Sequence, residues 1–150
     1  MPQETPYSLV RATVAVQEAS KRELVSVTRR LERAAVQLRP PAVAATLQDA
    51  RYLTDRTRAV YAELAAVGAP ARLYARGLQS WLAPGVTGIC LDDDDPLVDE
   101  WVVVLPGREP VVFAATDLGS TDCEDDERCF RYGMSSDPVV VAECGRLLGI

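Results

Sequence analysis

Apolar residues recur at two different spacings along the chain, and these spacings predict helices and strands. Over Lys21–Leu38 the apolar residues return every three or four positions, which is typical of one face of an amphipathic helix. Ser20 and Glu23 form an S-x-x-E capping box at its start, in which the serine hydroxyl accepts a backbone N–H and the glutamate reaches back. Pro40-Pro41 is expected to end this helix.

Two further helices are predicted from the residues that begin and end them. Thr54 is a suitable N-cap for a second helix, and Gly68 suits the left-handed position that follows its last turn. Asp137-Pro138 predicts the first turn of a C-terminal helix that continues almost to the end of the chain. Near the N-terminus, the apolar pattern of residues 8–19 fits both a helix and a strand, and we favour a helix there.

Short apolar runs of strand length lie between and after the predicted helices. The turn residues Pro106-Gly107 separate two of these runs, so we expect an antiparallel hairpin there. Residues 81–85 are expected to form a turn, and the polar residues 120–127 an exposed acidic loop. The predicted strands cover residues 42–47, 71–75, 86–91, 101–105, 111–115 and 130–134.

Together these elements predict the α+β fold class. We expect a single domain over residues 1–150, with a mainly antiparallel or mixed sheet of four or more strands, helices packed mainly on one face, and a helical N-terminal segment. A chain of 150 residues with 48% hydrophobic and 25% charged residues is ordinary for one such domain. Because there is neither a run of membrane-span length nor a secretory signal, we expect a cytoplasmic protein that binds no membrane.

Charge is distributed unevenly along the chain. The formal net charge of −6 argues against a nucleic acid as the partner, because nucleic-acid binding depends on a basic surface. The first 80 residues carry 12 basic and 7 acidic side chains, whereas the remaining residues carry 4 and 15. This asymmetry is compatible with solvated faces, and it also suggests oriented association with a charged partner or a second copy.

Histidine is absent and Lys21 is the sole lysine, which argues against an enzyme. The cluster Asp92–Asp95 follows an apolar strand, a position where carboxylates hold magnesium in phosphoryl-transfer enzymes. Those enzymes also need a lysine downstream, and none follows here. A magnesium-dependent phosphohydrolase is therefore a remote alternative, and we expect no metal site.

Three other groups of residues have a structural and a functional interpretation. Trp101 begins a strand and is expected in the core, or else in the wall of a ligand pocket. Cys123 and Cys129 are expected to be reduced thiols, with an oxidant-sensing disulfide as the alternative. One group of arginines is expected to consist of ordinary surface residues. The alternative is a site for an anionic ligand, because guanidinium groups bind anions through paired hydrogen bonds. That group comprises Arg51, Arg56, Arg58, Arg72 and Arg76.

Several stretches in this order resemble one family. The most specific is D-P-L-x-x-E-W over residues 95–101; others are the early helix LVSVTRRLERAA, the block Gln48–Thr54, and Asp117-Leu118 after an apolar strand. Over residues 8–148 the chain resembles the DICT sensory domain, an input domain associated with bacterial diguanylate cyclases and two-component systems. The resemblance implies a signal-input role without established catalytic residues, and it leaves the cofactor unknown.

The chain is therefore expected to be a non-catalytic sensory or regulatory module. It would bind a small-molecule ligand, a signalling protein that supplies the output, or both, and would change its conformation or its oligomeric state, for example as a homodimer. Its candidate ligand-binding residues are Arg51, Asp95, Trp101 and Asp117. The alternative is a protein–protein adaptor that acts through the basic N-terminal helix, with Arg22, Arg29, Arg30 and Arg33 as partner-binding residues.

Overall fold

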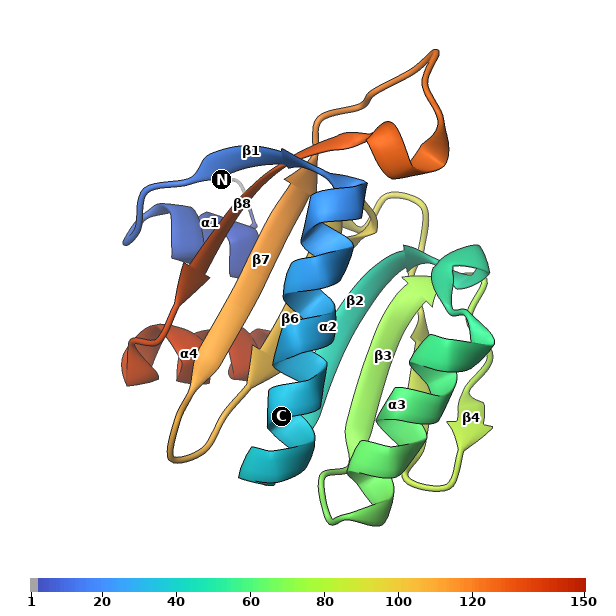
Figure 1. Cartoon of the computed structure of the whole chain (residues 1–150), viewed down its shortest axis with the longest axis vertical. Coiled ribbons are helices and arrows are strands. Elements are labelled where there is room, and N and C mark those ends of the chain that lie inside the picture. The colour runs from blue at the N-terminus through green and yellow to red at the C-terminus, as the bar shows by residue number, and fades with distance from the viewer. Residues whose placement is uncertain (1–2) are drawn as a thin grey trace.

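The computed structural model describes residues 3–150, and within this range eight strands form one mixed sheet (Figure 1). The strand order is β1-β8-β7-β6-β2-β3-β5-β4. Strands β2, β3 and β5 run parallel to one another, and the remaining neighbours are antiparallel. The strands are β1 (Gln17–Ser20), β2 (Val43–Asp49), β3 (Ala71–Arg76), β4 (Trp81–Ala83), β5 (Val86–Cys90), β6 (Glu100–Leu105), β7 (Val111–Asp117) and β8 (Cys129–Ser135).

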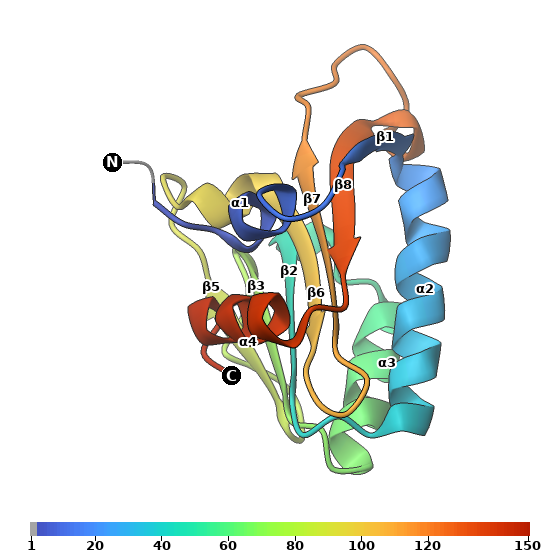
Figure 2. The ribbon, with the colours of Figure 1, turned by 90° about the vertical axis from the view of Figure 1, so that its left-hand side faces the viewer.

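Helices cover both faces of the sheet, as Figure 2 shows from the side. The two longest, α2 (Lys21–Leu38) and α3 (Asp55–Ala66), lie together on one face. The shorter α1 (Pro6–Arg11) and α4 (Pro138–Leu147) lie on the other face. The expectation that the helices pack mainly on one face is therefore not met, because α1 and α4 pack against the other side of the sheet. The predicted α+β class with a mixed sheet is confirmed. Within residues 3–150, no helix has both the length and the apolar character that crossing a membrane requires.

The helix boundaries follow the capping signals of the sequence. The Ser20 side chain accepts the backbone N–H of Glu23, and the Glu23 carboxylate accepts the backbone N–H of Ser20 at 3.2 Å. Helix α2 ends at Arg39, which has a left-handed backbone with φ of 50° immediately before the two prolines. Thr54 caps α3 and Asp137 caps α4, each by accepting a backbone N–H two or three residues ahead.

Two local predictions are wrong. In residues 8–19 the helix ends at Arg11, and residues 17–20 form strand β1, which pairs antiparallel with β8. Residues 81–83 form strand β4 rather than part of a turn, and only Pro84 and Gly85 make the turn into β5. In both segments the strand is fixed by a neighbouring strand, which local apolar spacing does not reveal.

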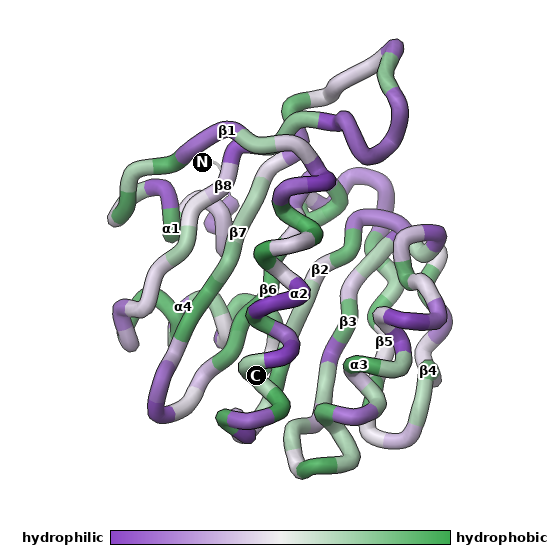
Figure 3. The backbone as a smooth tube through the Cα atoms, in the orientation of Figure 1, coloured by the Kyte–Doolittle hydropathy of each residue, from purple (hydrophilic) through white to green (hydrophobic). Residues whose placement is uncertain are grey.

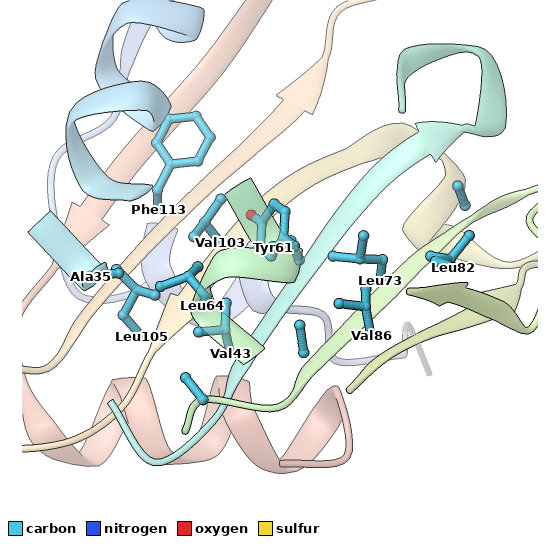
Figure 4. Packing of buried hydrophobic residues seen from close by; sticks show 14 of the residues in the cluster. Ala35, Val43, Tyr61, Leu64, Leu73, Leu82, Val86, Val103, Leu105 and Phe113 are labelled. Carbon is cyan, nitrogen blue, oxygen red and sulfur yellow. The ribbon is translucent and has the colours of Figure 1, made fainter. Parts of the chain in front are cut away.

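The core consists of two layers, one on each face of the sheet. On the α2/α3 face, Tyr61 and Leu64 of α3 pack with strand residues such as Leu73 and Phe113 (Figure 4). The opposite layer is equally apolar, with residues from α1, α4 and the other side of the strands. Apolar residues follow the central strands, whereas the loop between β7 and β8 is mostly hydrophilic (Figure 3). Fully buried members of the second layer are Val10, Ala44, Val102, Val104, Val112, Ala114, Cys144 and Leu148.

Candidate functional site

A cavity of about 860 Å³ lies on the α2/α3 face, toward the N-terminal ends of the two helices. Val25, Thr28 and Arg29 of α2 line one side of it. Thr57 and Val60 of α3 line the other side. Its volume falls within the range of small-molecule sites in proteins. The rest of the lining includes Leu47 of β2, Trp101 of β6, and Val98 of the 3-10 helix that precedes β6.

The course of the chain explains why the cavity lies at this end of the sheet. Parallel strands β2 and β3 are joined through the 3-10 helix η1 (Ala50–Tyr52) and α3, while the other neighbour of β2 is the antiparallel β6. The cavity is lined by residues at the carboxyl ends of β2 and β3, including Gln48 and Arg76. In open sheets, the crevice beyond the carboxyl ends of parallel strands is where ligands commonly bind.

An irregularity in β2 places Gln48 at the cavity. The register of β2 against β3 shifts between Thr46 and Gln48, and Gln48 has a positive φ of 69°, which is uncommon for a residue with a side chain. The Gln48 side chain is buried, and its amide nitrogen donates to Asp117 Oδ2 at 3.2 Å. Its amide oxygen accepts from Arg128 Nη2 at 3.2 Å. The bulge thus joins β2 to a network of charged groups.

Arg128 is the centre of that network. Its guanidinium forms an ion pair with Asp117 and a second one with Asp125 at 3.0 Å, and it donates to Tyr52 Oη at 2.6 Å. Lys21, the first residue of α2, also pairs with Asp125, and its ammonium nitrogen lies 3.9 Å from the centre of the Tyr52 ring. These contacts attach the loop of residues 118–128 to the start of α2 and to η1.

Two carboxylates at the cavity have pKa values shifted in opposite directions. Burial tends to raise the pKa of Asp117, but hydrogen bonds from the Gly119 N–H, Arg128 and Gln48 outweigh it and lower that pKa. Burial raises the pKa of Glu32, and the nearby Arg29 and Arg56 only partly oppose this effect. Asp117 is therefore held as an anion, whereas Glu32 is the weaker acid.

Four further arginines line the cavity, and of these only Arg51 touches the Arg128 network within residues 3–150. Arg51 donates to Tyr52 Oη at 3.1 Å. Arg76 lies 3.8 Å from Asp49, and its Nε atom is buried without a hydrogen-bond partner. Arg29 and Arg56 make no ion pair with any residue in the described range 3–150. The cavity is therefore rich in guanidinium groups with free donors.

The structure brings three of the four candidate ligand-binding residues together. Arg51, Trp101 and Asp117 all line the cavity. Trp101 is half-buried, and its ring packs edge-on against Phe113 at 5.6 Å between ring centres, so it belongs to the core and to the cavity wall at once. Asp95 does not line the cavity; its carboxylate accepts the Leu97 N–H at 2.9 Å and caps a 3-10 turn.

The arginine groups proposed from sequence are divided by the fold. Of the four candidate partner-binding residues on α2, Arg29 lines the cavity, Arg22 pairs with Asp126 at 2.7 Å, and Arg30 and Arg33 are exposed. Of the five arginines for which an anion site is the alternative, three line the cavity and two lie elsewhere. Arg58 donates to the Leu82 carbonyl, and Arg72 donates to Tyr74 Oη, which belongs to the opposite face.

The acidic and cysteine residues singled out in the sequence lie on exposed segments. Asp92, Asp93 and Asp94 are exposed in a turn after β5. Within residues 3–150, no three His, Cys, Asp or Glu side chains are placed to hold a metal ion. Cys123 and Cys129 are exposed free thiols, and Cys123 also lines the cavity.

Comparison with known proteins gives structural neighbours only. No family model matches the chain, and no curated protein matches it in sequence. A polyphosphate kinase from Porphyromonas gingivalis is similar over 89% of this chain and 22% of its own, with a TM-score of 0.54 and 14% identity. TrmBL2, an archaeal chromatin protein, is similar over 91% of this chain and 51% of its own, with a TM-score of 0.51 and 12% identity. The chain thus shares its fold with part of each of these larger proteins.

Proposed function

We propose that this chain is a non-catalytic sensory or regulatory module whose cavity between α2 and α3 binds a small molecule. The observation that carries the proposal is the composition of the cavity. Its apolar part is formed by the indole ring of Trp101 and by the aliphatic side chains of Leu47, Val60 and Val98. Polar groups of Gln48, Arg51 and Asp117 line the same space. The lining is more polar than apolar, and convergent polar groups beside an apolar wall are the features that orient a small molecule in a binding site.

The Arg128 network offers a physical route from ligand to signal. The ion pairs of Asp125 with Lys21 and Arg128 hold the loop 118–128 against the cavity. A ligand that binds one position of this loop better than another shifts the populations of the two positions. The exposed acidic surface of the loop then changes for a signalling partner or for a second copy of the chain. The resemblance to DICT input domains supports the same role.

Catalysis and nucleic-acid binding are not part of the proposal. The chain has no histidine, and its one lysine is already paired with Asp125. DNA binding is named for the chromatin protein TrmBL2, but a net charge of −6 gives this chain no comparable electrostatic attraction to DNA.

A pair of dyes tests ligand binding at this cavity. In the variant Trp81→Phe, Trp101 is the only tryptophan, and Trp81 itself is 68% exposed, so its loss leaves the core intact. The probes are 1-anilinonaphthalene-8-sulfonate and its uncharged parent, N-phenyl-1-naphthylamine. We expect at least one dye to bind once per chain, to quench Trp101 emission, and to change hydrogen exchange in residues 118–128.

The proposal is contradicted if neither dye quenches Trp101, or if a dye binds without any change in exchange of the loop. A matched control, Arg146→Gln on the opposite face, should leave dye binding unchanged, because within residues 3–150 the one ion pair of Arg146 is with Glu143 on the surface of α4. Native mass spectrometry of the protein purified from its own cells adds a direct readout of a bound small molecule.

A further inference from the structure

The charged groups around the cavity fall into two halves that differ in how they are paired. We call Lys21, Arg128, Asp117 and Asp125 the paired half. Its two cations and two anions form ion pairs with one another, so the half is electrically balanced. Balanced pairs of this kind hold the protein in shape and leave little attraction for an external charge.

The other half, which we call the arginine half, is not balanced. It consists of Arg29, Arg51, Arg56 and Arg76. Among the described residues, the one ion pair that any of them makes is the 3.8 Å contact of Arg76 with Asp49. The buried Nε of Arg76 has no hydrogen-bond acceptor, and a buried donor without an acceptor costs free energy until a partner arrives.

The nearby carboxylates compensate this charge only in part. Asp99 also lines the cavity, but within residues 3–150 it forms no ion pair with any of these arginines. Glu32 lines the cavity close to Arg29 and Arg56, but it is largely buried and also faces the phenol of Tyr61. The Tyr61 hydroxyl is itself completely buried. Arg29 comes from α2 and Arg56 from the first turn of α3, so guanidinium groups approach the same space from two facing helices.

We infer that the arginine half is a subsite for the carboxylate or phosphate group of the ligand, whose apolar body lies against Trp101, Leu47 and Val60. The inference rests on the proposed function, because it names the chemistry of the molecule that enters the cavity. Planar guanidinium groups bind carboxylate and phosphate oxygens through paired, charge-assisted hydrogen bonds. The subsite lies at the N-terminal end of α3, where the helix dipole adds to the attraction.

The two dyes separate this inference from the proposed function, since they share one aromatic body and differ in the sulfonate. In the Trp81→Phe background we expect the sulfonated dye to bind about tenfold more tightly than the uncharged one, which is the effect of one charge-assisted interaction. The double variant Arg29→Gln/Arg56→Gln should remove this preference and leave binding of the uncharged dye unchanged. Phenylacetate and phenyl phosphate should displace the sulfonated dye, and their order shows which anion fits better; benzyl alcohol should not.

The double variant Arg30→Gln/Arg33→Gln is the matched control, because these two residues of α2 are exposed, as Arg29 and Arg56 are, but lie outside the cavity. It should keep the preference, which separates the subsite from a general loss of positive charge. Arg51→Gln, in an exposed turn, is a second test that does not depend on the helix packing, and it should weaken the preference.

Equal binding of the two dyes, with Trp101 quenched, overturns the anion subsite and leaves the proposed function standing. A preference that survives in Arg29→Gln/Arg56→Gln also overturns it. The absence of binding by either dye contradicts the subsite and the proposed function together.

Discussion

The face of the sheet under α1 and α4 is closed by packed side chains, whereas the face under α2 and α3 opens at one end into a charged cavity. On the closed face, Val10, Val102 and Leu148 are completely buried. The titratable groups there are also removed from water: burial, with Glu100 nearby, raises the pKa of the Cys144 thiol to about 12. On the open face, Gln48, Arg76 and Asp117 lie at the carboxyl ends of β2, β3 and β7 and line the cavity.

The difference shows how one sheet serves two purposes. Alternate residues of β6 point to opposite faces, so Val102 and Val104 complete the closed layer while Val103 belongs to the layer under α2 and α3. The closed face supplies stability through close packing. On the open face, side chains around the cavity make fewer apolar contacts, and the arginines that line it have N–H groups available to bind a ligand.

The largest effect is expected from a matched pair of leucine truncations. Leu148→Ala on the closed face should lower the free energy of unfolding by about 3 kcal/mol, because a fully buried leucine leaves a cavity behind. Leu47→Ala on the floor of the open cavity should cost about 1 kcal/mol, because that side chain is only partly buried. Chemical denaturation measures both. Equal costs would contradict the contrast between a packed face and an open one.

The next effect compares two arginines near the edge of the sheet. Arg128→Ala should lower the free energy of unfolding by about 2 kcal/mol, since it leaves the partly buried Asp117 carboxylate without its cation. Arg131→Ala removes an exposed pair with Glu18 and should cost less than about 0.5 kcal/mol. Hydrogen exchange should rise in residues 118–128 only for Arg128→Ala. A loop that stays protected in that variant would show that the network does not hold it.

Most of the fold was predictable from the sequence because local signals determined it. The capping box of Ser20 and Glu23, the N-cap Thr54 and the turn at Pro106-Gly107 each depend on neighbours along the chain. Strands β1 and β4 were missed because each is short, lies at an edge of the sheet, and is fixed by pairing with a distant or adjacent strand. The full coverage of both faces also depends on where α1 and α4 pack, which apolar spacing does not specify.

The candidate site was predictable only in part. Arg51, Trp101 and Asp117 were singled out through the family resemblance, and the structure places them around one cavity. Gln48 gave no signal as a site residue, because a bulge with positive φ is not visible in apolar spacing. Arg128 was missed because its importance comes from contacts with residues 80 and 76 positions away in the chain, Gln48 and Tyr52.

The smallest effect concerns pH and contrasts one carboxylate from each face. Glu100 on the closed face accepts the Tyr7 N–H at 3.0 Å, and burial raises its pKa above the ordinary 4.5. Its contribution to stability is therefore complete below pH 4.5 and is lost as the pH rises through the folded-state pKa. Glu100→Gln does not undergo this loss, so the stability of the wild type relative to this variant should fall by at most about 1 kcal/mol over that interval.

Asp117 on the open face should behave in the opposite way. Its pKa lies below the ordinary 3.8, so its contribution is present above pH 3.8 and is lost as the pH falls through the folded-state pKa. The stability of the wild type relative to Asp117→Asn should therefore decrease toward low pH, whereas that relative to Glu100→Gln should increase. Thermal unfolding of the wild type and both variants across the acidic range measures the two slopes. Slopes of the same sign would mean that the two faces do not differ in how they hold charge.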